Sequence, residues 1–115
     1  MLHKTRSRTA AKRRSHAPVF AALGDETRLA LVAKLAHGEP RSISQLTEGS
    51  KLTRQAITKH LRVLEGAGLV HGLRSGRENL FQFDSEPIQH LKEYLDLVSK
   101  QWDEALGRLK LFVEK

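Results

Sequence analysis

Residues 52–70, LTRQAITKHLRVLEGAGLV, decide the fold of this chain. Three apolar residues in this stretch recur at helical spacing and predict one buried stripe on a helix over 53–66: Ile57, Leu61 and Leu64. Thr53 is placed to cap the start of this helix, because its hydroxyl oxygen accepts a hydrogen bond from a first-turn backbone N–H. Gly66 and Gly68 predict its end.

A second, shorter helix is predicted just before it. Ser44 is expected to cap this helix, which runs to about Gly49, and Lys51 and Leu52 then turn the chain. Two short helices joined by a tight turn match a helix-turn-helix motif. The face of the 53–66 helix opposite its apolar stripe carries five polar side chains: Arg54, Gln55, Thr58, Lys59 and Arg62. These residue types read base edges and hold phosphates in duplex DNA, although an ordinary solvated helix face has a similar composition.

A hairpin is predicted directly after this motif. Leu69–Arg74 and Asn79–Phe83 are strand candidates, joined by a short connection that contains Gly76. Arg74 and Arg77 flank the tip, so the hairpin is interpreted as a wing that grips the phosphate backbone or probes the minor groove. From Lys51 to Glu78 the chain holds six basic and two acidic residues, a local net charge of +4. The order of helix-turn-helix and then wing favours a DNA-binding surface over a solvated face.

Helices are also predicted on both sides of this centre. Pro18 suits the first turn of a helix that Gly24 ends, and Asp25 caps the next. The apolar residues of this next helix are Leu29, Val32, Leu35 and Ala36. A long helix is predicted from about residue 87 to 113 with one nearly unbroken stripe: Ile88, Leu91, Leu95, Val98, Trp102, Leu106, Leu109 and Phe112. A chain of 115 residues cannot cover such a stripe alone, so a homodimer is predicted.

The expected fold is therefore mainly α with a β-hairpin wing, in the order α-α-α-α-β-β-α, and dimeric. The dimer interface is expected to include Val19, Phe20, Leu91, Leu95, Val98, Trp102 and Leu109. One domain is predicted over 17–115, preceded by a disordered basic tail over 1–16 with six basic residues and no acid. The tail is interpreted as an arm that contacts DNA or as a solubilising segment; a transit peptide is a third reading.

The net charge of +7 favours a polyanionic partner, but outside the tail 14 basic residues face 13 acidic ones. The chain has no cysteine, which excludes disulfides and thiolate metal sites and agrees with a reducing cytoplasm. No apolar run reaches the length of a membrane span, so no membrane partner is expected. Catalysis is not expected, because phosphate-binding loops, nucleophile elbows and His-Glu metal helices are missing from the sequence.

The sequence resembles the ArsR/SmtB family of bacterial winged-helix regulators across about residues 18–113. The resemblance rests on ALGDETRLALVAKL, ISQL, LTRQAITKHLRVLEGAGLV and RSGRENLFQF. It implies a homodimer joined through the first and last helices, a palindromic operator and repression relieved by an effector. Thr47 and Lys51 replace the alanine and glycine common in the family, which suggests a strained Lys51 or a turn taken by Gly49. Arg28, in the Asp-x-Thr-Arg run, and His60 are interpreted as structural.

Metal sensing, for which the family is best known, is not expected here. His90-x-x-Glu93 is the nearest match to a metal pair on the last helix, and nothing completes a four-ligand set, so no metal or other cofactor is predicted. The effector is left open between a small organic molecule, a protein and none.

The sequence therefore predicts a transcriptional regulator that binds specific DNA, a homodimeric repressor on a palindromic operator. The DNA contacts are predicted to be Thr53, Arg54, Gln55, Thr58, Lys59, Arg62, Arg74 and Arg77. A winged-helix scaffold for protein interaction is the alternative, and an RNA-binding winged helix is disfavoured because the basic face has no stacking aromatic residue.

Overall fold

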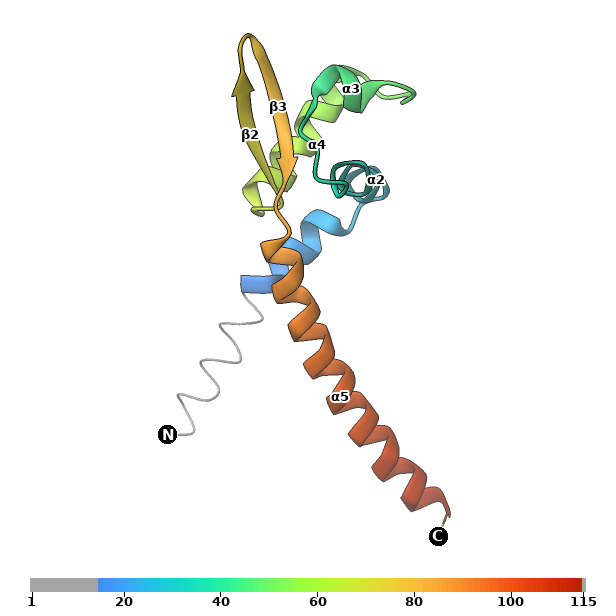
Figure 1. The fold of residues 1–115 in the computed structure, drawn as a ribbon. Coiled ribbons are helices and arrows are strands. Elements are labelled where there is room, and N and C mark those ends of the chain that lie inside the picture. Colours follow the sequence, from blue (N-terminus) through green and yellow to red (C-terminus); the bar gives the residue numbers. More distant parts are fainter. Residues whose placement is uncertain (1–14, 115) are drawn as a thin grey trace.

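The computed structural model describes residues 15–114, in which a small helical body carries a three-stranded sheet and one long projecting helix (Figure 1). After a first helix over 15–23, the elements are α2 (Glu26–Leu35), β1 (Arg41–Ser42), α3 (Ile43–Thr47), α4 (Arg54–Gly66), β2 (Val70–Ser75), β3 (Glu78–Phe83) and α5 (Glu86–Glu114). The predicted fold class is confirmed, with one addition, the short strand β1. The predicted tail lies outside the described residues except for 15 and 16, which belong to the first helix.

The helix boundaries follow from local capping, with one correction. Asp25 and Thr53 cap α2 and α4 as predicted, accepting from the backbone N–H groups of Arg28 and Ala56. The prediction that Ser44 caps α3 was wrong. Ser42 is the cap and forms a reciprocal capping box with Gln45, which satisfies two backbone N–H groups at once.

The turn between α3 and α4 has lysine rather than glycine at position 51, and a different glycine takes the left-handed conformation. Gly49 has a φ of 76°, and every non-glycine residue in the described part of the chain has a negative φ. Gly49 therefore takes the left-handed conformation, and Lys51 is not strained.

The strand β1 was not predicted, because two residues give no periodicity to detect. It pairs antiparallel with β3 in a sheet of order β1-β3-β2. At the tip of the hairpin Ser75 pairs with Glu78, so the loop is only Gly76-Arg77. Gly76 has a φ of 61° and Arg77 does not share a positive φ, as in a type II′ turn, whose twist suits a hairpin.

The core gathers leucines from every helix around α4. The most deeply buried large side chains are Leu35, Leu46, Ile57, Leu61, Leu64, Leu69 and Val70. In α2 the predicted face was partly wrong: Leu31 is buried with Leu35, whereas Leu29 is 52% exposed. Both sets have helical spacing, and the packing of α2 on α4 selects the one that faces inward.

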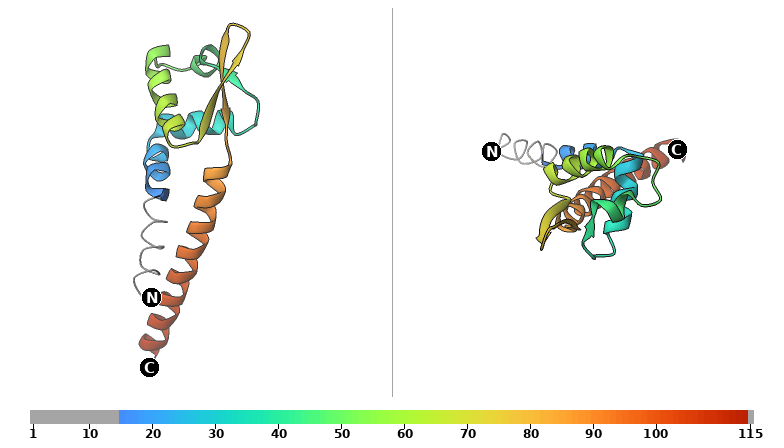
Figure 2. Two further views of the ribbon diagram at one scale, coloured as in Figure 1. Left: turned by 90° about the vertical axis from the view of Figure 1, so that its left-hand side faces the viewer. Right: turned by 90° about the horizontal axis from the view of Figure 1, so that it is seen from above.

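The helix α5 projects away from this body (Figures 1 and 2). The radius of gyration is 19.0 Å, against roughly 13 Å for a compact domain of this size. Beyond Leu91, which is buried, α5 exposes a series of large apolar side chains: Leu95, Leu97, Trp102, Leu106, Leu109, Leu111, Phe112 and Val113. Within the described part of the chain, no helix is apolar over a stretch long enough to span a membrane.

Candidate nucleic-acid interface

The helix α4 separates buried and exposed side chains as its sequence predicted. Ile57, Leu61 and Leu64 are fully buried against the body, which turns Arg54, Gln55, Lys59 and Arg62 toward solvent. Two predicted contacts also have structural roles. The Oγ1 of Thr53 accepts from Ala56 N at 3.1 Å, and the Oγ1 of Thr58 donates to Arg54 O at 2.7 Å. Thr53 keeps its hydroxyl proton for a further partner, whereas Thr58 has already donated its own.

The wing lies beside α4, and arginines from both elements line the same hollows. Arg54 and Arg77 line one hollow of about 300 Å³. Arg62 and Arg74 line a second hollow of about 230 Å³. The four arginines thus form two pairs, each with one member on α4 and one on the hairpin, a surface we call the paired-arginine face.

This face lies at the end of the molecule opposite the free end of α5, where the hairpin tip and α3 project (Figure 1). Asn79 lines both hollows, and Ser42 and Ser44 line the one that contains Arg54 and Arg77. Sequence reasoning did not select these three polar residues. Their signal was weak, since only the pairing of β1 with β3 brings residues near position 42 to the wing.

The charge on this face is largely available for a polyanion. Arg62 forms an exposed ion pair with Glu65 at 3.0 Å. Such surface pairs contribute at most about 1 kcal/mol, so a phosphate can replace the glutamate at little cost. A concave, basic surface formed by a helix and a hairpin is suited to the backbone and major groove of duplex DNA.

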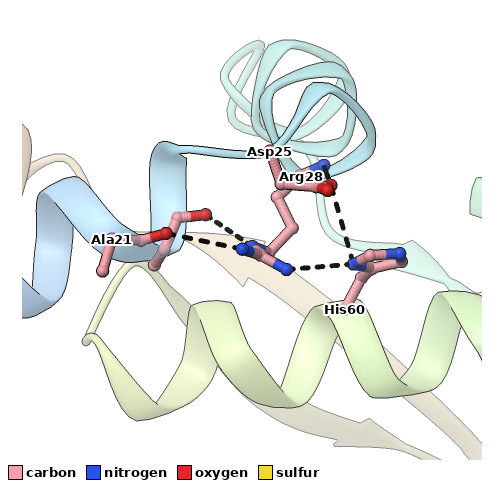
Figure 3. A network of polar contacts seen from close by, with 5 residues as sticks. Ala21, Asp25, Arg28 and His60 are labelled. Atoms are coloured by element: carbon pink, nitrogen blue, oxygen red, sulfur yellow. Dashed lines mark hydrogen bonds and ion pairs between the residues drawn. The ribbon is translucent and has the colours of Figure 1, made fainter.

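Behind this face, a polar network anchors α4 to the first two helices (Figure 3). Arg28 donates from Nε to Ala22 O at 2.6 Å and from Nη2 to Ala21 O at 3.4 Å, so it caps the end of the 15–23 helix. Its Nη1 lies 3.3 Å from Nδ1 of His60. The structural interpretation of Arg28 and His60 matches these contacts.

Asp25 completes the network. Its Oδ2 accepts from Arg28 N at 3.0 Å and lies 3.8 Å from Nδ1 of His60. The backbone hydrogen bond from Arg28 is the main reason that the pKa of Asp25 lies below its usual value, with the positive charge of the Arg28 side chain acting in the same direction.

The candidate metal pair on α5 lies far from this face. His90 is 3.6 Å from Glu86 and 3.9 Å from Glu93, as expected for surface residues one helix turn apart. Across residues 15–114, His, Asp and Glu side chains do not form any group of three or more that would hold a metal ion.

A helix-turn-helix whose second helix is exposed and basic, followed directly by a basic hairpin, defines a winged helix-turn-helix DNA-binding protein. A family model described as a helix-turn-helix domain matches residues 23–72. The HTH-type transcriptional regulator YuzN of Bacillus subtilis is 39% identical over 64% of this chain and 86% of its own. The transcriptional repressor SmtB of Mycobacterium tuberculosis is 31% identical over 74% of this chain and 61% of its own.

Among solved structures, an ArsR-like transcriptional regulator from Rhodococcus sp. RHA1 is 33% identical. It superimposes with a TM-score of 0.77 over 89% of this chain and 95% of its own. The chain belongs to the ArsR/SmtB family of winged helix-turn-helix transcriptional regulators. It is a DNA-binding regulator of transcription.

Proposed function

We propose that the protein is a homodimeric repressor that binds a palindromic operator through the paired-arginine face, acting on DNA in the bacterial cytoplasm. The observation that carries this proposal is that Arg54 and Arg77 line one hollow and that Arg62 and Arg74 line a second. A similar relative, SmtB of Mycobacterium tuberculosis, carries the name repressor.

The predicted DNA contacts divide into two roles by their position on α4 and on the wing. The first turn of a recognition helix enters the major groove most deeply, so Thr53, Arg54, Gln55 and Thr58 are assigned to base edges or the floor of the groove. Of these, Gln55 is exposed and is suited to adenine. The residues a turn later or on the wing are assigned to phosphates: Lys59, Arg62, Arg74 and Arg77.

The dimer is inferred from the apolar surface that α5 leaves open. Phe20, Leu95, Trp102 and Leu109 are all exposed, and Trp102 is 64% exposed. Val98 lies half-buried on the same stripe. The other two residues of the proposed interface, Val19 and Leu91, are already buried in this chain's own core, so the surface left for a partner begins at Phe20 and Leu95. A row of large apolar side chains of this length marks an interaction surface, and a two-fold partner presents the same row in return.

The proposal is tested by titrating the full chain against duplexes from the promoter of its own gene and against scrambled duplexes of equal length. Fluorescence anisotropy at several salt concentrations gives both the preference and the number of phosphates contacted. We expect a preferred, inverted-repeat duplex bound by two chains. Equal affinity for scrambled DNA, or a stoichiometry of one chain per site, would contradict the proposal.

A further inference from the structure

A hollow of about 670 Å³ lies between the 15–23 helix, the first turns of α5 and the base of the hairpin. Its size falls within the range of about 300–1,000 Å³ typical of small-molecule sites. Part of its lining is apolar, from Val19, Ala67, Pro87 and Leu97.

Among the described residues that line the hollow, the charged side chains are carboxylates. The hollow is lined by three carboxylates, three histidines and one tyrosine phenol, and no lysine or arginine is among the described residues that line it. This is unusual in a chain with 20 basic residues. A cation would find several carboxylate oxygens there.

Two of the three carboxylates are free to accept a new partner. Asp84 is engaged at both oxygens, by His71 Nε2 at 2.7 Å and by Glu86 N at 2.9 Å. Glu86 and Glu93 are held only by long contacts to His90, at 3.6 and 3.9 Å, and both side chains are largely exposed. These two glutamates are therefore the groups that a cation would meet.

Two aromatic rings, those of His16 and Tyr94, line the same hollow. The ring of Tyr94 lies 5.0 Å from that of His16, and Phe20 packs edge-on against Tyr94 at 6.2 Å. Aromatic faces attract organic cations, and the apolar lining suits a ligand with a hydrophobic body.

On α5, the hollow and the apolar stripe that is proposed to form the dimer lie on different sides of the helix, although Phe20, which packs against Tyr94, belongs to the proposed dimer surface. At 3.6 residues per turn, His90, Glu93 and Leu97 lie on a flank of α5 to one side of Leu95 and Trp102. At its other end the hollow is lined by Gly68 and His71, where β2 begins and the wing is attached.

We propose that this hollow binds a hydrophobic organic cation and that its occupation changes the affinity of the protein for DNA. The binding of the cation does not depend on the proposed function, whereas the effect on DNA rests on it. Because the hollow touches the start of the wing, a ligand there acts on the strand that carries Arg74.

The first test is the binding of tetraphenylphosphonium to the full chain, measured by equilibrium dialysis without DNA. We expect saturable binding of one cation per chain, whereas tetraphenylborate, of the same shape and opposite charge, should not bind when it is dialysed in a separate experiment. Glu86→Gln and Glu93→Gln should each weaken binding by about two- to fivefold, as expected for exposed charge pairs. Glu104→Gln is the matched control, because Glu104 lies on the same flank of α5 beyond the hollow and should leave binding unchanged.

Three results would overturn the site: no saturable binding, equal binding by the double variant Glu86→Gln/Glu93→Gln, or equal binding of tetraphenylborate when it is dialysed alone. A hollow filled by a second copy of the chain would give the first of these.

The second test measures the dissociation constant for the preferred duplex with and without saturating tetraphenylphosphonium. We expect a change of at least about threefold in the wild type, within the usual range of allosteric coupling, and a smaller change in the double variant at the same cation concentration. An unchanged constant in the wild type would overturn the effect on DNA. If no duplex is preferred, the proposed function fails, while the dialysis result still decides whether the cation site exists.

Discussion

Arg28 donates a hydrogen bond from its guanidinium to Nδ1 of His60 across 3.3 Å, which joins α2 to the recognition helix α4 (Figure 3). Because a guanidinium can only donate, Nδ1 must accept, and the ring proton of His60 resides on Nε2. The same guanidinium caps the end of the 15–23 helix through Ala21 and Ala22. One side chain therefore sets the position of the recognition helix relative to the first helix.

Arg28→Ala should lower the free energy of unfolding by about 1–3 kcal/mol, because the Ala22 carbonyl and the His60 ring lose the donor that Arg28 supplies. Arg28→Lys should recover only part of this, since an ammonium lacks the planar fork. Urea unfolding at one fixed protein concentration measures both. In a double-mutant cycle with His60→Ala we expect a coupling of roughly 0.5–1 kcal/mol; strict additivity would show that the Arg28–His60 contact contributes nothing.

Ser42 and Ser44 give a matched pair that tests the capping of α3. Ser42→Ala removes the hydroxyl that accepts from Gln45 N at 3.1 Å and should cost about 1 kcal/mol of stability. Ser44→Ala changes an exposed residue inside the helix and should stay within about 0.5 kcal/mol of the wild type. Thermal or urea unfolding separates the two, and the opposite order would restore Ser44 as the cap.

Gln55 and Arg77 should differ in the kind of effect they have on DNA binding. Gln55→Ala should cost roughly 1–3 kcal/mol on the preferred duplex and relax the preference at one base pair. Arg77→Ala should weaken binding to all duplexes about equally and reduce the salt slope by about one unit per subunit. Titrations on preferred and scrambled duplexes measure both effects. A uniform loss for Gln55→Ala, or a change of preference alone for Arg77→Ala, would reverse the assigned roles.

Leu109 and Leu111 test the dimer stripe, since both are exposed leucines near the end of α5, at 57% and 65%. They lie on opposite sides of the helix, and only Leu109 belongs to the stripe of Leu95 and Trp102. Leu109→Asp should shift the protein toward monomer in sedimentation at micromolar concentration, because a buried charge opposes association. Leu111→Asp should leave the dimer intact. Equal effects, or a wild type that is a folded monomer, would rule out this interface.

Asp84 should make stability depend on pH in the acid range. The hydrogen bonds from Glu86 N and then His71 hold the pKa of Asp84 below its usual value. A carboxyl with a lowered folded pKa stabilises the protein above its unfolded pKa, near 4, and this contribution disappears as the pH falls through the folded value. Asp84→Asn should therefore be less stable than the wild type at pH 7, and the difference should shrink below about pH 4. A difference independent of pH would exclude the charge of Asp84 as its source.

Much of this molecule is determined by local sequence. Three kinds of feature could be predicted from the sequence, because each depends on neighbours within a few residues. They are the helical spacing of Ile57, Leu61 and Leu64, the caps Asp25 and Thr53, and the turn at Gly76. The same local signals predicted which basic side chains lie on the recognition helix and on the wing. Those side chains in turn predicted the class of protein, a winged helix-turn-helix DNA-binding regulator.

What remained undecided depended on contacts between distant segments. The helical spacing of α2 fits either Leu29 or Leu31 facing inward, and only packing against α4 chose Leu31. The strand β1 exists because residues 41 and 42 meet β3 some forty positions later. Likewise, the pairing of Arg54 with Arg77 and the carboxylate-lined hollow beside α5 arise where separate elements converge. Sequence patterns fix the conformation of each element, whereas the free energy of packing decides which of its faces is buried and which side chains meet.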